Sequence, residues 1–267
     1  MRPFLFLLLA LPLFLLTALP SFAAPQPWGL SLQSPLSPVA HRIHDFHDIL
    51  IYVIFFITLF VLGLLLYVTW RFRASKNPVP SKTSHNTMLE VIWTAVPVLI
   101  LVAIVVPSMR LLYFTDVAPD TAFTVKVTGH QWYWQYDYPD HGGMTFDSYM
   151  IEEKDLKPGQ KRLLDVDNPL VLPVGTKIKF ILTSADVIHS WAMPSLAIKT
   201  DTIPGRLNET WTRIEKEGLY YGQCSEICGV GHAFMPIVIK AISPEAFDLW
   251  IQEKGGKIQQ KTPSKDL

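Results

Sequence analysis

Both cysteines of this protein lie in one short stretch that also carries a histidine and a methionine. The stretch runs from Cys224 to Met235 and follows the pattern C-x3-C-x3-H-x2-M, with His232 as its imidazole. Thiolate, imidazole and thioether groups are ligands that suit copper, whereas magnesium and calcium prefer oxygen ligands. Glycines at 222, 229 and 231 allow tight backbone turns, so that these side chains could converge on one point. The stretch therefore predicts a redox-active metal site.

A second histidine, His189, follows a strand-like run upstream of this stretch. One histidine from a distant strand together with a Cys/His/Met loop resembles the ligand layout of a cupredoxin. A blue-copper site needs a single cysteine, so the second cysteine indicates two coppers bridged by two thiolates. A small disulfide between Cys224 and Cys228 is the alternative, because exported domains fold in an oxidising compartment. A disulfide needs neither the histidines nor the methionine, and the full pattern favours metal.

The composition of the chain indicates a membrane and gives no sign of nucleic-acid binding. The 267 residues carry a formal net charge of zero, and the apolar residues are concentrated before residue 115. Residues 1–23 combine Arg2, an apolar run and a small-x-small ending, which predicts a signal peptide cleaved after Ala23. An uncleaved membrane anchor is the alternative. Residues 24–47 then form a proline-rich N-terminal segment outside the cytoplasm.

Two apolar runs predict a transmembrane helical hairpin over residues 48–114. Residues 49–70 contain no charged side chain, and residues 89–113 contain only Glu90 and Arg110. Each run is long enough to cross a bilayer as a helix. The loop between them, at about 71–88, is basic and contains no acidic residue. By the positive-inside rule this loop is cytoplasmic, which puts the N-terminal segment and everything after the hairpin outside.

Charged and titratable residues near the ends of the two runs have alternative roles. Thr87-Met88-Leu89-Glu90 fits a capping box, in which Glu90 bonds the backbone at the start of the helix. An ionisable group at the inner edge of a membrane can instead admit protons to a buried pathway. The local sequence favours the cap. His41, His44 and His47 recur every third residue, which favours one face of an interfacial helix over a metal site.

Residues 115–254 have the pattern of an exported β domain. Short strand-like runs alternate with Pro/Gly turns, which predicts an antiparallel sandwich or barrel; the runs are 123–128, 176–184, 210–214, 219–223 and 236–242. Ser243-Pro244-Glu245 predicts the start of a short helix. Residues 255–267 are rich in lysine and predict a disordered tail.

An aromatic run at 131–138 is expected to form a strand with Trp132, Trp134, Tyr136 and Tyr138 on one face. Most of these rings are expected to be core. An exposed tryptophan beside a copper site would also be a contact and electron-uptake point. Acidic residues gather nearby in the sequence and, if several share a face, would steer a basic partner; they include Asp137, Asp140, Asp147, Glu152, Glu153, Asp155, Asp165 and Asp167.

Taken together, these features resemble subunit II of the haem–copper cytochrome c oxidases of the aa3 type. The resemblance covers nearly the whole chain after the signal peptide and rests on six segments: EVIWTAVP at 90–97, GHQWYW at 129–134, FDSYM at 146–150, DVIHSW at 186–191, KTDTIPGR at 199–206 and YYGQCSEIC at 220–228. It implies two transmembrane helices followed by an all-β, cupredoxin-like Greek-key sandwich or barrel. It also implies electron transfer from cytochrome c to the haem of subunit I, where oxygen is reduced and protons are translocated.

The resemblance assigns roles residue by residue. It implies that two copper ions, the copper A centre, are held by side chains of His189, Cys224, Cys228, His232 and Met235 and by the carbonyl of Glu226. The Glu226 carboxylate would share a magnesium ion with subunit I. Trp132 would be where the electron enters, and Glu90 would lie at the mouth of the proton-uptake channel. Docking of cytochrome c would involve Asp137, Asp140, Asp167 and Asp186.

The implied partners are cytochrome c, oxidase subunits I and III and the lipid bilayer, in a bacterial plasma membrane with the β domain in the periplasm. The chain has no C-x-x-C-H motif, so the cytochrome is expected to be a separate protein. Three rivals are a copper-free quinol-oxidase subunit II, a nitrous-oxide reductase and a membrane-anchored structural or thiol-redox protein. The filled ligand positions disfavour the first, and the two spans and the missing catalytic domain disfavour the second.

Overall fold

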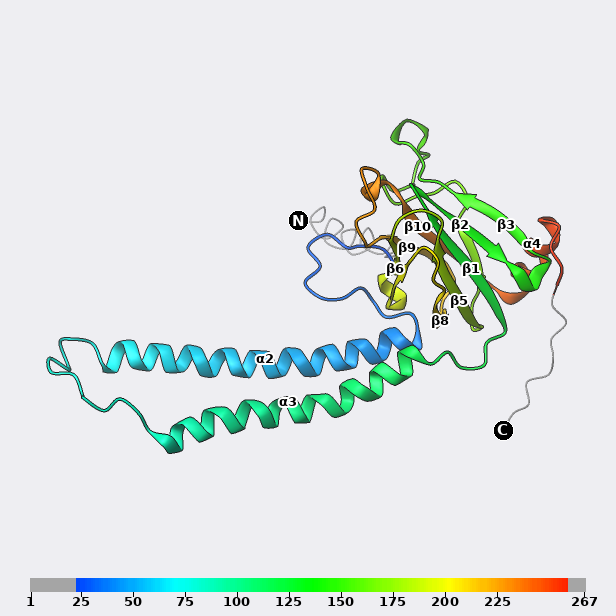
Figure 1. Cartoon of the computed structure of the whole chain (residues 1–267). Helices are drawn as coiled ribbons and strands as arrows, with labels where there is room; N and C mark the ends of the chain where they lie inside the picture. The colour runs from blue at the N-terminus through cyan, green and yellow to red at the C-terminus, as the bar shows by residue number, and fades with distance from the viewer. Residues whose placement is uncertain (1–22, 259–267) are drawn as a thin grey trace, which may run out of the picture.

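The computed structural model describes residues 23–258, which form a long helical hairpin joined to a β-sheet domain (Figure 1). The expected signal peptide therefore lies outside the described residues except for Ala23, and so do residues 259–267 of the expected tail. Ala23 is buried against the β domain, and its carbonyl accepts a hydrogen bond from the Tyr221 N–H at 3.1 Å.

The hairpin consists of α2 (Pro38–Arg71) and α3 (Thr87–Asp116). Both helices are long and apolar enough to cross a membrane, and their most apolar segments are not buried against the rest of the described chain. The two predicted spans are confirmed. The loop that joins them lies at the end of the hairpin farthest from the β domain (Figure 1).

Helix α2 begins well before the uncharged run that predicted it. The Ser37 Oγ accepts a hydrogen bond from the Ala40 N–H at 3.1 Å, and Pro38 occupies the first turn, where its missing N–H costs nothing. The segment before the span is thus helical from Pro38 onward. Its three histidines lie on this helix, as their spacing predicted.

Helix α3 is capped by Asn86 and not by Thr87, so the predicted capping box was displaced by one residue. The Asn86 Oδ1 accepts a hydrogen bond from the Leu89 N–H at 3.1 Å, because a short amide side chain reaches the third N–H of the helix. The Glu90 Oε1 accepts a hydrogen bond from the Asn86 N–H at 3.3 Å, so the predicted contact of Glu90 with the start of the helix is present. The helix continues through Pro97 and Pro107.

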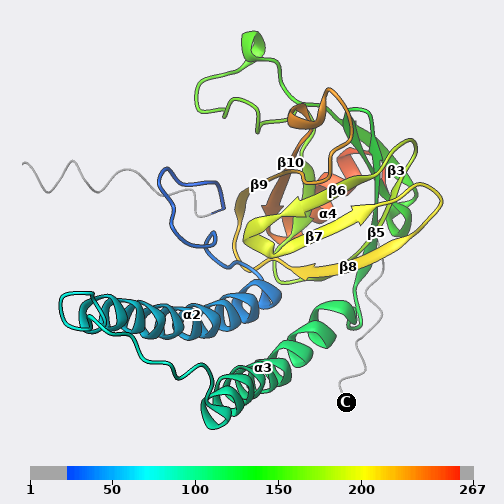
Figure 2. The same cartoon turned by 60° about the vertical axis from the view of Figure 1, so that its left-hand side comes forward.

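Ten strands build the β domain within the described chain. They are β1 (Phe123–His130), β2 (Tyr133–Tyr138), β3 (Met144–Ser148), β4 (Leu170–Pro173), β5 (Lys177–Ser184), β6 (His189–Met193), β7 (Ile198–Thr202), β8 (Asn208–Arg213), β9 (Gly218–Cys224) and β10 (Pro236–Ile242). They form two five-stranded sheets, in the orders β3-β2-β1-β5-β8 and β4-β10-β9-β6-β7. Figure 2 shows β6 and β7 side by side in the second sheet. The predicted sandwich is confirmed. The prediction of purely antiparallel pairing is wrong, because β1–β5 and β4–β10 pair in parallel.

The core lies between the two sheets. Phe180 of β5 and Trp191 of β6 meet there with ring centroids 4.9 Å apart, and both are fully buried. The predicted common face of β2 is also buried, with Trp134, Tyr136 and Tyr138 at 0% exposure. Burial of about 150–250 Å² by each such ring makes this aromatic layer a main source of domain stability.

Helix α4 (Pro244–Glu253) closes one end of the sandwich. Its predicted cap is confirmed, since the Ser243 Oγ accepts a hydrogen bond from the Ala246 N–H at 3.2 Å. Phe247 stacks on Phe123 with centroids 5.4 Å apart. The first residues after this helix, which were expected to belong to the disordered tail, are bonded to the domain: the Lys257 N–H donates to the His141 carbonyl at 3.0 Å.

The hairpin and the β domain meet at two places. At the start of α2, the Leu36 N–H donates to the Ser195 carbonyl at 3.0 Å and the Ser37 Oγ donates to the Leu196 carbonyl at 2.8 Å. At the end of α3, Phe114 packs edge to face against Trp211 of β8 with centroids 5.5 Å apart. Both helix ends that face the domain are therefore attached to it.

Candidate metal centre

The loop between β9 and β10 carries the Cys/His/Met stretch. The two strands pair antiparallel, and the Cys224 N–H donates to the Met235 carbonyl at 3.3 Å, which closes the loop at its base. Gly222 lies within β9 and not in a turn. A Cβ there would lie 2.0 Å from the Ala192 carbonyl oxygen of β6, so only glycine allows these strands to approach so closely. Of the three glycines, only Gly229 has the positive φ (120°) that a tight turn requires.

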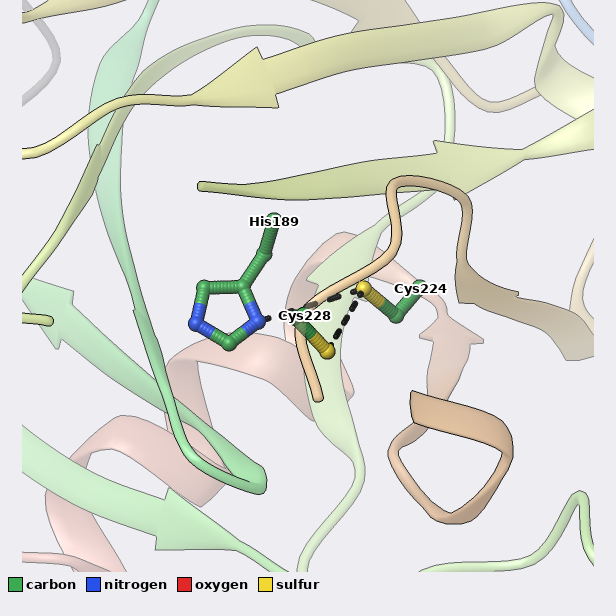
Figure 3. A group of neighbouring side chains, drawn as sticks. All are labelled: His189, Cys224 and Cys228. Atoms are coloured by element: carbon green, nitrogen blue, oxygen red, sulfur yellow. Dashed lines mark hydrogen bonds between the residues drawn. The ribbon is translucent and has the colours of Figure 1, made fainter. Parts of the chain in front are cut away.

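His189 reaches this loop from the neighbouring strand. It is the first residue of β6, and the pairing of Trp191 with Cys224 in the β6–β9 ladder places its imidazole beside the first thiol. The His189 Nδ1 is 3.9 Å from the Cys224 Sγ, and the side chain is fully buried. Figure 3 shows the imidazole and the two thiols facing one another.

The structure brings all six expected ligand groups together. The Cys224 Sγ is 3.8 Å from the Cys228 Sγ and 3.4 Å from the Glu226 carbonyl oxygen. The Cys228 Sγ is 3.6 Å from the His232 Nδ1 and 3.5 Å from the Met235 Sδ. Every candidate ligand thus lies within 4 Å of one of two sulfur atoms that are themselves neighbours.

The two cysteines are free thiols and do not form the alternative disulfide. Their sulfur atoms are 3.8 Å apart, compared with about 2.05 Å in a disulfide. Both thiols are buried. The donor set of two thiols, two imidazoles, a thioether and a carbonyl fits a pair of copper ions by its softness, and it does not fit a hard cation.

The two thiols differ in how readily they ionise. Burial opposes ionisation of Cys224, but hydrogen bonding to His189 and to the backbone of Glu226 and Ser190 outweighs it and lowers the thiol pKa to about 7. Burial and then the neighbouring Cys224 charge raise the pKa of the Cys228 thiol to about 12. Two adjacent thiolates therefore require a compensating positive charge, which bound metal provides.

Asp186 holds the buried imidazole of His189. Its Oδ1 is 2.8 Å from the His189 Nε2, on the opposite side of the ring from the sulfur atoms, and its Oδ2 accepts from the Gln131 N–H at 2.7 Å. Burial alone would raise the pKa of this carboxyl, but hydrogen bonds from His189 and from two backbone N–H groups lower it. The carboxylate thus fixes which ring nitrogen faces the thiols.

Trp132 lies against the cysteine loop. It does not continue the buried face of β2, because residues 131 and 132 form the turn between β1 and β2. Its Nε1–H donates to the Cys228 carbonyl at 3.2 Å, and Gln131 donates through Nε2 to the same oxygen at 2.9 Å. A Cβ on Gly231 would lie 2.3 Å from the Trp132 Cδ2, so this glycine makes room for the indole.

Two residues that support the centre were not singled out from the sequence for that role. Gln131 shares the Cys228 carbonyl with Trp132. Trp134, expected only as part of the aromatic face, donates its Nε1–H to the Met235 carbonyl at 3.3 Å and packs edge to face on His189. The clustering of aromatics at 131–138 was the available signal, but it does not reveal which ring reaches which carbonyl.

The four acidic residues expected at a docking surface are not gathered at one place. Asp186 lies beside the metal centre, whereas Asp137 is five residues from Trp132 along the β2 direction, about 17 Å in extended chain. Asp140 accepts from the Thr124 N–H at 2.7 Å, and Asp167 accepts from the Tyr149 N–H at 2.8 Å. Asp137 pairs with Lys126 at 3.8 Å.

Glu90, the residue expected at the proton-uptake channel, lies at the start of α3, at the end of the hairpin far from the β domain (Figure 1).

Comparison with known proteins matches both parts of the chain. Residues 123–242 match the family model described as cytochrome C oxidase subunit II, periplasmic domain, and residues 25–111 match its transmembrane domain. A probable cytochrome c oxidase subunit 2 of Rickettsia felis is 53% identical over 247 residues, which are 92% of this chain and 78% of the relative. The cytochrome c oxidase subunit 2 of Oenothera berteroana is 49% identical over 234 residues, which are 85% of this chain and 91% of the relative.

Among solved structures, the chain is similar to the periplasmic domain of subunit II of cytochrome oxidase from Bradyrhizobium japonicum. The sequence identity is 49%, and the TM-score is 0.49. The match covers 52% of this chain and 97% of that domain.

Proposed function

The chain belongs to the cytochrome c oxidase subunit II family, the electron-accepting subunit with a copper A domain, and from this premise we propose how it acts. Its β domain takes one electron at a time from a separate cytochrome c and passes it to the haem of oxidase subunit I. The observation that carries the proposal is the cluster of six groups around two adjacent, buried, unbonded sulfur atoms.

These six groups would hold two copper ions, with Cys224 and Cys228 as bridging thiolates, His189 and His232 as imidazole ligands, and Met235 and the Glu226 carbonyl completing the set. When bound, the copper pair takes up and releases a single electron that both metals share. The protein's own part is to keep the ligands fixed. The Cys224–Met235 backbone contact closes the loop, Asp186 orients one imidazole, and burial of both thiols excludes water.

Electron uptake would occur at Trp132, whose indole N–H is bonded to the carbonyl of a proposed ligand, Cys228. Exposed apolar side chains of the same loop, Ile227, Val230 and Phe234, offer a contact surface beside it. Asp186 and Asp167 would steer the basic face of cytochrome c toward this end, because Asp167 is bonded to the Tyr149 N–H and the Tyr149 ring stacks on Tyr133, the neighbour of Trp132. Asp137 and Asp140 would contribute at longer range.

The remaining assignments concern partners and orientation. The Glu226 carboxylate, which is half-buried, would share a magnesium ion with subunit I. Glu90 would admit protons at the cytoplasmic edge of the membrane while it also caps α3. The basic loop at about 71–88 supports a cytoplasmic loop and a periplasmic β domain over residues 115–254. The chain would lie with subunits I and III in a bacterial plasma membrane, in keeping with its 53% identity to the Rickettsia felis relative.

The test measures the copper content of the oxidase complex that contains this chain, together with its visible and electron paramagnetic resonance spectra. The wild-type chain is expected to bind two coppers that share one unpaired electron in the oxidised state. Cys224→Ser and Cys228→Ser are expected to abolish that signal, while Ser225→Ala in the same loop preserves it. If the chain binds no copper and has a Cys224–Cys228 disulfide after treatment with copper and a mild reductant, the result would support a thiol-redox protein. If the complex without this copper turns over with quinol, the result would support a quinol oxidase.

A further inference from the structure

A recess outside the metal centre lies where α3 leaves its apolar span and meets β8. Its volume is about 430 Å³. Most of its wall is apolar or aromatic and comes from the start of α2, the end of α3, the link that follows α3 and strand β8: Pro38, Tyr113, Phe114, Val117, Pro119 and Trp211. Lys177 and Arg213 complete the lining. The recess thus combines a hydrophobic wall with two cations at the end of a membrane helix.

The two cations project from the same face of the sheet. Lys177 of β5 pairs directly with Arg213 of β8, and directly opposed residues of an antiparallel pair point to the same side. Trp211, two residues before Arg213, shares that face. Lys177 has no ion-pair partner among the described residues. Arg213 has only Glu215, at 3.9 Å, and that carboxylate is closer to His41 at 2.9 Å. The ion pairs of the described chain therefore leave Lys177 unpaired and Arg213 only weakly paired.

Trp211 supplies an independent sign that an acceptor is missing. Its side chain is only 5% exposed, and its Nε1–H has no hydrogen-bond acceptor among the described residues. An indole N–H can only donate, so a buried one normally finds an acceptor. Phosphate and ester oxygens are acceptors, and both occur in the head region of a glycerophospholipid.

We propose that this recess binds the head region of an anionic glycerophospholipid from the leaflet that faces the β domain. Lys177 and Arg213 would pair with the phosphate, and Trp211 would donate to a phosphate or ester oxygen. Tyr113, Phe114 and Val117 would contact the start of an acyl chain. Aromatic residues are favoured at this depth of a membrane, and basic pockets beside membrane helices bind anionic head groups. A free phosphate ion would satisfy the cations but would leave the apolar wall uncovered.

The experiment counts the phospholipids retained by the detergent-purified oxidase complex, by native mass spectrometry, after incubation with phosphatidylglycerol, phosphatidylcholine or inorganic phosphate. Wild-type complex is expected to retain one more phosphatidylglycerol than a Lys177→Gln/Arg213→Gln double variant. Each lost cation is expected to weaken binding about fivefold. Trp211→Phe, which keeps the ring but not the donor, is expected to weaken binding by a similar factor. Copper content verifies that every variant is folded.

Lys179→Gln is the matched control, because Lys179 lies on the same face of the same strand but pairs with Glu209 at 2.7 Å and does not line the recess. It is expected to bind like the wild type. Unchanged phosphatidylglycerol retention in the double variant would overturn the proposal. The same result is expected if a partner subunit fills the recess. If inorganic phosphate competes as well as phosphatidylglycerol, the recess binds a simple anion and not a lipid. If Lys179→Gln loses as much phosphatidylglycerol as the double variant, the retention depends on general surface charge and not on the recess.

Discussion

Replacing Asp186 by asparagine separates its support of His189 from its proposed part in docking. The carboxylate Oδ1 is 2.8 Å from the His189 Nε2, and the other oxygen accepts from the Gln131 N–H. Asparagine has nearly the same shape and keeps one acceptor, but it has no charge. Loss of a charge-assisted hydrogen bond costs about 1.5–3 kcal/mol, which corresponds to roughly 10- to 150-fold in copper affinity. Losses of about 10- to 100-fold are typical for a carboxylate that orients a metal-bound histidine.

The assay is competition for copper between the full chain and a chelator of known affinity, together with the reduction potential of the copper-loaded protein. Asp167→Asn is the matched control, because Asp167 also accepts backbone N–H groups, from Tyr149 and Asn168, but contacts no imidazole. Asp186→Asn is expected to weaken copper binding, and Asp167→Asn is not. If both variants retain wild-type copper affinity while only cytochrome c binding changes, the positioning role of Asp186 is refuted and docking remains.

Three further predictions concern electron uptake, proton uptake and docking. Gly231→Ala places a Cβ against the Trp132 ring, so we expect about 1–3 kcal/mol loss of stability and slower reduction by cytochrome c at unchanged copper content, measured by thermal unfolding and stopped-flow absorbance. Glu90→Gln keeps an oxygen that can accept from the Asn86 N–H, so we expect unchanged thermal stability but slower proton uptake. Unchanged turnover would limit the role of Glu90 to capping α3. Raising the salt concentration from about 0.1 M to 1 M shortens the screening length from about 10 Å to 3 Å and is expected to raise KM for cytochrome c, whereas a flat response would exclude acidic steering.

The membrane hairpin and the sandwich could be predicted from the sequence, because long uncharged runs and short strands with Pro/Gly turns are local signals. Other features depend on contacts between distant segments. Parallel pairing of β1 with β5 cannot be deduced from the alternation of apolar and polar residues, since the same alternation occurs in parallel and antiparallel strands. Strand β6 was not delimited because all five of its residues are buried, which removes the alternating pattern. The displaced cap of α3 arose because Asn86 and Thr87 are both good capping residues and lie side by side.

The members of the candidate metal centre could be predicted, but their supporting contacts could not. The spacing of Cys224, Cys228, His232 and Met235 indicated one shared site, because a short loop forces them together. Asp186 was assigned only to docking, since nothing in the sequence shows that its oxygen atoms are occupied by His189 and Gln131. The position of Trp132 in a turn depends on where β1 ends, and a one-residue change in that boundary would direct its ring elsewhere.

The two attachments between hairpin and β domain have a consequence for long-range electron transfer. A domain tethered by a single flexible linker would swing, and tunnelling rates fall steeply whenever donor and acceptor move apart. Here the start of α2 is hydrogen-bonded to the chain at Ser195 and Leu196, and the end of α3 is packed on Trp211, so rotation about either helix end is opposed by the other. The hairpin therefore holds the β domain, and with it the two thiols, in a fixed position relative to the two apolar helices.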